Sequence, residues 1–228
     1  MSSRWILCRW ALVVVFLAPE LCGAQVPACL APDPAATIES VMARAGIDDK
    51  ELLARLVYAE AASTGFPDDA AVYEAIAWGV MNRVRLGEAS ATMRSVYGRG
   101  LRGVIFKKGQ FNPAVSPRSR FSRMFLCPES PRRWAVALAA AQAALLGEGN
   151  PFIATTWERE HGLSLVVNFY YPCSTQAKGP YAPWERSGGL RFTGDVAVGG
   201  HLLGAGRVRF YRLVRPPRDV RIPRDPAR

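Results

Sequence analysis

The sequence contains little histidine, little cysteine and no long apolar segment. Its two histidines, His161 and His201, do not have the spacing that zinc peptidases use to bind their metal. A thiol hydrolase needs a cysteine close to a histidine, but Cys173 follows a strand-like segment instead of opening a helix. No stretch approaches the roughly 20 apolar residues that a membrane-spanning helix needs. The sequence therefore argues against both classes of peptidase, and it predicts no metal, no cofactor and no transmembrane segment in the mature chain.

The first 24 residues have the three parts of a secretory signal peptide. Arg4 and Arg9 provide positive charge, residues 11–17 form a short apolar core, and residues 22–24 offer the small side chains of a cleavage site. We expect residues 1–24 to be removed, and the mature protein to be exported to the periplasm or secreted.

Three cysteines remain if the chain is cleaved after Ala24. Cys29, Cys127 and Cys173 would then lie in an oxidising compartment, where disulfides persist. Cys127 and Cys173 both fall within the predicted folded domain, whereas Cys29 falls in a segment rich in proline and alanine. We therefore expect a Cys127–Cys173 disulfide, with pairing to Cys29 as the alternative. The alternative to cleavage after Ala24 is a lipoprotein that is lipidated at Cys22.

Positive charge is concentrated near the C-terminus. The chain has a formal net charge of +10, and residues 207–228 contain eight arginines, two aspartates and four prolines. We expect residues 215–228 to form an extended, solvated basic tail that is attracted to polyanions. Export favours an anionic envelope surface over nucleic acid as its partner, and the alternative is a disordered end that only improves solubility.

The mature chain is expected to contain a linker, one folded domain and the basic tail. Residues 25–48, with a modest helical stretch at 37–45, are interpreted as a linker or N-terminal arm, and residues 49–214 as the domain. Helices are predicted at 49–62, 67–85 and 131–146, and strands at 163–171, 190–193, 196–198 and 208–213. Helices first and strands later indicate an α+β domain with a helical half and a small antiparallel sheet.

Two of the predicted helices have clear end signals. Asp48 and Asp49 can accept hydrogen bonds from the free amides of a first helical turn. Ser130 as cap, Pro131 at the first helical position and Gly147 after the last turn define the helix at 131–146.

The first helix of the domain carries a carboxylate on its apolar face. Leu53, Leu56 and Glu60 are spaced so that they share one face of a helix. Because burial disfavours the charged form of a carboxyl, Glu60 is expected to have a raised pKa, which a general acid needs near neutral pH. The alternative is a buried glutamate that is paired with one of the nearby arginines, Arg55, Arg83 or Arg85.

An ordered series of motifs resembles a known family. Leu53-Ala-Arg-Leu-Val-Tyr-Ala-Glu60-Ala, followed by Val80-Met-Asn-Arg-Val84, is similar to the start of the cell wall hydrolase family typified by the spore-cortex-lytic enzymes. Further matches follow in the family's order: Gly103-Val-Ile-Phe106, Gly109-Gln-Phe111, Asn168-Phe-Tyr-Tyr-Pro172, Ala182-Pro-Trp184 and Phe210-Tyr-Arg212. The resemblance covers roughly residues 52–212.

The resemblance implies a lysozyme-like α+β domain that binds peptidoglycan glycan strands. It implies cleavage of the bond between N-acetylmuramic acid and N-acetylglucosamine, in the manner of a lytic transglycosylase with Glu60 as the catalytic residue. One carboxyl then serves as acid and base, so the paired carboxylates of ordinary glycosidases are not needed. We expect no second acidic residue in a comparable buried setting, since Asp68 and Asp69 resemble helix caps and Glu74 falls outside an apolar stripe.

Position in the resemblance also indicates residues that would hold the sugars. Aromatic faces and amide groups suit a neutral polyhydroxylated chain, and the candidates are Gln110, Phe111, Tyr170, Tyr171 and Trp184. Adjacent residues of a regular strand point to opposite faces, so only one of the two tyrosines should face the cleft, and Tyr171 is preferred. The alternative for Phe111 and for one tyrosine is a place in the core, and Trp184 could cover the sheet. Asn82 could support the helix of Glu60, or lie on the surface.

The sequence departs from the family pattern at several places. Residues 61–67 replace the arginine and the Gly-Glu turn that usually follow the glutamate, and Pro172-Cys173 replaces Asn-Pro after the two tyrosines. Segments 112–130 and 150–162 are interpreted as insertions. The alternative function is therefore a catalytically inactive module that binds peptidoglycan or assists envelope assembly.

Overall fold

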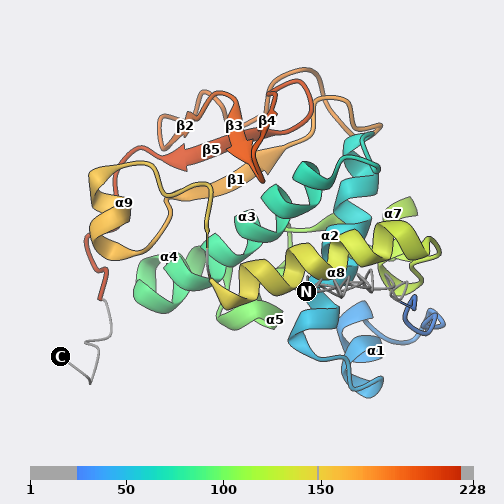
Figure 1. The fold of residues 1–228 in the computed structure, drawn as a ribbon. Helices are drawn as coiled ribbons and strands as arrows, with labels where there is room; N and C mark the ends of the chain where they lie inside the picture. The colour runs from blue at the N-terminus through green and yellow to red at the C-terminus, as the bar shows by residue number, and fades with distance from the viewer. Residues whose placement is uncertain (1–24, 148, 222–228) are drawn as a thin grey trace, which may run out of the picture.

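A computed structural model describes residues 25–147 and 149–221, so the predicted signal peptide lies outside the described residues (Figure 1). The helices are α1 (Ile38–Arg44), α2 (Asp49–Thr64), α3 (Ala70–Ala89), α4 (Ala91–Tyr97), α5 (Gly100–Ile105), α6 (Asn112–Val115), α7 (Arg120–Leu126), α8 (Pro131–Leu146) and α9 (Thr156–His161). The strands are β1 (Val166–Tyr170), β2 (Leu190–Phe192), β3 (Val196–Val198), β4 (His201–Leu203) and β5 (Arg209–Leu213). The predicted α+β class is confirmed.

The centre of the helical half is built by α2, α3 and α8, which pack against one another (Figure 1). Their ends follow the predicted signals. The Asp48 side chain accepts from the amide of Glu51 at the start of α2, and Ser130 caps α8 while Gly147 ends it in the left-handed conformation. Because α2 and α3 are covered on nearly all sides, most of their residues are buried.

The strands form two small antiparallel sheets. One has the order β1-β5-β2, and the other is the β3–β4 hairpin, in which β4 was not predicted. The first sheet lies beside α3, and β1 contacts this helix (Figure 1). Gly79 permits the contact, because a Cβ there would lie 2.8 Å from a ring carbon of Phe169. The strand β1 is thereby held close to the helical layer.

The N-terminal arm is packed onto the domain rather than free of it. The amide of Leu30 donates to the carbonyl of Leu126 over 3.0 Å. The buried guanidinium of Arg55 donates to the carbonyl oxygens of Ala28 and Leu126. Residues 25–48 therefore belong to the folded unit and are not a linker.

The predicted Cys127–Cys173 disulfide is wrong. Cys29 is bonded to Cys127, and the exposed thiol of Cys173 donates to the carbonyl of Gly206. The reason is the packing of the arm, which brings Cys29 to the residue that ends α7. The sequence could not show this contact, because the two cysteines are 98 residues apart.

The first part of the predicted basic tail is also attached to the domain. The Asp219 carboxylate accepts from the Ser90 hydroxyl (2.6 Å) and from the amide of Thr92 (2.8 Å), where α4 begins. The amide of Arg221 donates to the carbonyl of Ala89. Residues 215–221 are therefore not a free tail, and residues 222–228 lie outside the described part.

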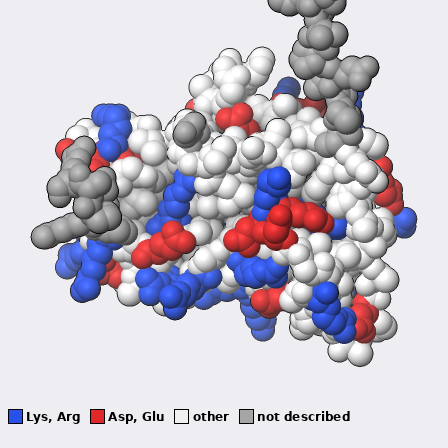
Figure 2. All heavy atoms as spheres, turned by 60° about the horizontal axis from the view of Figure 1, so that its bottom comes forward, with Lys and Arg blue, Asp and Glu red and all other residues white. Residues whose placement is uncertain are grey.

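Charges of both signs are interspersed on the face shown in Figure 2, where basic and acidic side chains lie side by side. Among the described residues, no helix is both long enough and apolar enough to cross a lipid bilayer.

Candidate active site

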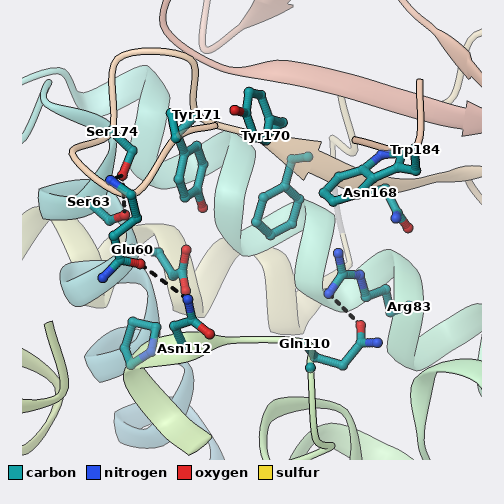
Figure 3. A pocket seen from close by; sticks show the side chains of 15 residues that line it. Glu60, Ser63, Arg83, Gln110, Asn112, Asn168, Tyr170, Tyr171, Ser174 and Trp184 are labelled. Carbon is teal, nitrogen blue, oxygen red and sulfur yellow. Dashed lines mark hydrogen bonds between the residues drawn. The ribbon is translucent and has the colours of Figure 1, made fainter. Parts of the chain in front are cut away.

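A cavity of about 360 Å³ lies between α2, α3, β1 and the segment that follows β1 (Figure 3). Its wall contains one acidic and one basic side chain, Glu60 and Arg83, and is otherwise neutral. The lining residues are Glu60, Ser63, Arg83, Gly109, Gln110, Asn112, Pro113, Asn168, Phe169, Tyr170, Tyr171, Ser174, Gln176, Ala177 and Trp184. The cavity thus combines one carboxyl group with amides, hydroxyls and aromatic rings.

Glu60 is a nearly fully buried carboxyl of α2 that opens on this cavity. Its side chain is held on the inward face of the helix, as the spacing predicts, and the residue is 6% exposed. Burial raises its pKa from the ordinary 4.5 to about 7, against the opposing effects of the Tyr171 hydroxyl and the Arg83 charge. The Glu60 carboxyl is therefore about half protonated near neutral pH.

The alternative of an arginine paired with Glu60 is not what the structure shows, since no ion pair within 4 Å joins Glu60 to another described residue. Arg55 pairs with Glu51 at 2.8 Å, and Arg85 donates to the carbonyl of Ala144. Arg83 lowers the pKa of Glu60 through space only.

Arg83 is a buried cation on the cavity wall. It is 4% exposed, its Nε donates to the carbonyl of Val167, and its Nη1 donates to Oε1 of Gln110 at 2.8 Å. Its guanidinium carbon lies 4.8 Å from the ring centre of Phe111 and 4.9 Å from that of Phe169. The guanidinium is therefore held in place by two hydrogen bonds and by cation–π contacts with two aromatic rings.

Four of the five predicted sugar-binding residues line the cavity: Gln110, Tyr170, Tyr171 and Trp184. The fifth, Phe111, does not. It is 1% exposed and packs against Phe169, with ring centres 6.0 Å apart. Phe111 precedes α6 and points into the core, so its assignment to the cleft is corrected to a packing role.

Both adjacent tyrosines face the cavity, contrary to the expectation from strand alternation. The reason is that β1 ends at Tyr170, so Tyr171 already lies in irregular chain and is not bound by the strand's alternation. The Tyr170 hydroxyl donates to the carbonyl of Gly179 at 2.7 Å, which holds the following segment. In Figure 3 the Tyr171 ring directs its hydroxyl toward Glu60.

Two buried polar groups of the cavity have no hydrogen-bond partner within the described part of the chain. They are the Tyr171 hydroxyl, which is nevertheless near enough to Glu60 to lower the pKa of that carboxyl, and Nε1 of Trp184. The edge of the Trp184 indole packs against the ring of Tyr170, with centres 6.1 Å apart and planes at 89°.

Several polar cavity residues were not predicted from the sequence. The Ser63 and Ser174 hydroxyls lie 3.3 Å apart, and Asn112 donates to Gln176 over 3.2 Å (Figure 3). The segment after β1 carries Ser174 and Gln176 back toward α2, and irregular chain of this kind has no periodic signal in a sequence. Asn112 lies in a segment that was interpreted as an insertion.

Asn82 is neither on the surface nor attached to the helix of Glu60. It is 1% exposed, donates to the carbonyl of Val166, and accepts from Asn150 at 2.8 Å. Asn82 therefore joins α3 to β1, which carries the cavity tyrosines.

A second carboxylate is fully buried, contrary to expectation. Glu158 accepts from the amides of Ala154, Thr155 and Leu165, and it lies 3.3 Å from the guanidinium of Arg212. Burial alone would raise the pKa of Glu158, but these amides and the Arg212 charge together lower it. Glu158 is not among the residues that line the cavity of Glu60, so it organises the turn before α9.

Within the described ranges, no three or more histidine, cysteine and acidic side chains are grouped so that they could hold a metal ion. No family model, no curated protein and no solved structure matches the chain. The family resemblance therefore stays a prediction that rests on the quoted motifs.

Proposed function

We propose that the chain is a peptidoglycan-cleaving glycosidase of the lytic transglycosylase type, with Glu60 as its single general acid and base and a lysozyme-like catalytic domain. The observation that carries the proposal is Glu60 itself. It is a buried carboxyl with a pKa of about 7, it lacks an ion pair to any described residue, and it opens on a cavity lined by amides, hydroxyls and aromatic rings. A carboxyl of this kind retains the proton that a general acid must deliver.

The proposed reaction uses the carboxyl twice. Protonated Glu60 gives its proton to the glycosidic oxygen, and the bond from that oxygen to C1 of N-acetylmuramic acid breaks. The Glu60 carboxylate then takes the proton of the C6 hydroxyl as O6 bonds to C1, which closes a 1,6-anhydro ring and restores the acid. Between the two steps, the Arg83 charge and the Tyr171 hydroxyl favour the carboxylate, because both lower its pKa.

The other lining residues supply the binding functions that a glycan needs. The indole of Trp184 and the ring of Tyr170 offer apolar surface to a sugar ring, while Gln110 and Asn168 offer amides to its hydroxyls. The Cys29–Cys127 disulfide is compatible with export to an oxidising compartment, where peptidoglycan is accessible.

Digestion of purified sacculi tests the proposal. The unmodified protein should release soluble muropeptides that carry 1,6-anhydro ends, identified by mass spectrometry. Glu60→Gln should lose at least about a hundredfold in rate, the usual lower contribution of a general acid, while it still sediments with sacculi. Glu160→Gln is the matched control, since Glu160 is an exposed carboxylate of α9.

Two outcomes would contradict the proposal. One is a Glu60→Gln protein that digests sacculi as fast as the unmodified protein. The other is an unmodified protein that binds sacculi and releases nothing, which would identify the chain as a binding module.

A further inference from the structure

Arg83 presents a charge that no described carboxylate neutralises. It is 4% exposed, and no acidic group lies within 4 Å of it in the part of the chain that the structure describes. Its described partners are the carbonyl of Val167, the amide oxygen of Gln110 and three aromatic rings, of which that of Tyr97 is centred 5.5 Å away. Buried charges are normally paired, so the guanidinium is suited to a negative group from outside the chain.

Arg83 is part of the cavity wall, and one of its guanidinium nitrogens is without a described hydrogen-bond partner. Nε and Nη1 are occupied, whereas Nη2 makes no hydrogen bond to any described residue. The other charged lining residue, Glu60, is neutral when it is ready to act as an acid. The two N–H groups of Nη2 remain available, and they can donate charge-assisted hydrogen bonds to a carboxylate. In Figure 3, Arg83 and Glu60 border the same space from α3 and α2.

We propose that Arg83 forms a carboxylate-binding subsite beside Glu60, and that it takes the free lactyl carboxylate of N-acetylmuramic acid. This inference rests on the proposed function. The lactyl group is attached to the same sugar whose glycosidic bond Glu60 would break, so both groups must fit one cavity of about 360 Å³. When a stem peptide is attached, this carboxyl becomes an uncharged amide. The preferred substrate is therefore a glycan strand without stem peptides.

The first experiment compares two forms of the substrate. Sacculi are digested either untreated or after an amidase has removed the stem peptides and exposed the lactyl carboxylates. The unmodified protein should digest the stripped strands about tenfold faster, since a charge-assisted hydrogen bond contributes about this much. Arg83→Gln should lose the preference. Arg85→Gln is the matched control, because Arg85 lies on the same helix, bonds to Ala144 and is not part of the cavity wall.

The substrate comparison can overturn the inference in two ways. If Arg83→Gln digests stripped strands faster by the same factor as the unmodified protein, Arg83 does not bind the lactyl carboxylate. A preference for untreated sacculi that Arg83→Gln abolishes would show that the subsite binds a carboxylate of the stem peptide instead of the lactyl group.

The second experiment needs neither turnover nor an Arg83 variant. Binding of N-acetylmuramic acid and of its methyl ester to the unmodified protein is measured by NMR titration. The free acid should bind about tenfold more tightly, because only it carries the negative charge. Equal affinities would overturn the inference. If the free acid binds more tightly but the protein does not digest sacculi, the proposed function is refuted and the carboxylate subsite is supported.

Discussion

The raised pKa of Glu60 makes the stability of the folded protein depend on pH. The pKa is about 7 in the folded state against an ordinary value of 4.5, so the folded protein holds a proton that the unfolded chain has lost over this interval. The free energy of unfolding therefore falls as the pH rises from about 4.5 to about 7, and the contribution is fully present only below 4.5. At about 1.4 kcal/mol for each pH unit, the total loss over these 2.5 units is about 3.5 kcal/mol.

Replacing Glu60 by glutamine removes this loss, because a buried amide does not ionise. The Glu60→Gln protein should gain stability over the unmodified protein as the pH rises, by about 2.5 kcal/mol near pH 8 relative to their difference near pH 5. Urea titrations followed by circular dichroism at a series of pH values measure this difference. In a chain of this size it corresponds to a rise in Tm of roughly 5–10 °C.

The comparison with an exposed carboxylate shows whether burial is the cause. Glu160→Gln removes a carboxylate from the surface of α9, so its stability should follow that of the unmodified protein across the series. Parallel curves for Glu60→Gln and the unmodified protein would refute the reasoning, because Glu60 would then have the same pKa in the folded and unfolded states.

The same site and the two packed ends of the chain give further predictions. Muropeptide release should fall as the pH rises above about 7, as Glu60 loses the proton that it must donate, and an activity that keeps rising there would contradict this. Exchanging both Cys29 and Cys127 for serine should lower the free energy of unfolding by about 5 kcal/mol, from the entropy of a loop of about 100 residues, whereas Cys173→Ser should have little effect in the same urea titration. Asp219→Asn should release the C-terminal segment from the start of α4, seen as faster trypsin cleavage of that segment with an unchanged core.

The parts of the fold that the sequence predicted are those with local signals. The helix α8 begins and ends where Ser130, Pro131 and Gly147 indicated, because capping depends on residues within one turn of the helix end. The positions of β1 and β5 followed from runs of β-branched and aromatic residues. The attachment of residues 25–48 and 215–221 was missed, since it depends on contacts between segments that are far apart in the chain.

In the candidate site, too, the sequence predicted the features that depend on local spacing and missed those that depend on distant contacts. The burial of Glu60 followed from its spacing to Leu53 and Leu56 on one helix. The role of Arg83 in the cavity did not, because helical spacing shows which face a residue occupies but not which strand or loop covers that face. Phe111 was misplaced for a related reason: an aromatic residue beside a cleft motif has the same sequence signature whether its ring lines the cleft or packs beneath it.

The two buried carboxylates in the described part of the chain, Glu60 and Glu158, supply an argument about function. Glu158 shows how this fold stabilises a buried carboxylate that serves structure: three backbone amides and an arginine bond to it, and they lower its pKa in spite of burial. Glu60 has none of these amides, although α2 offers it an equally buried place, and its pKa is raised instead. A structural carboxylate left in that condition would destabilise the protein above neutral pH, because the Tyr171 hydroxyl and the Arg83 charge do not offset the effect of burial. A proton donor, by contrast, must lack such amides. Amides that donate to the carboxylate would stabilise its charged form, which has no proton to give.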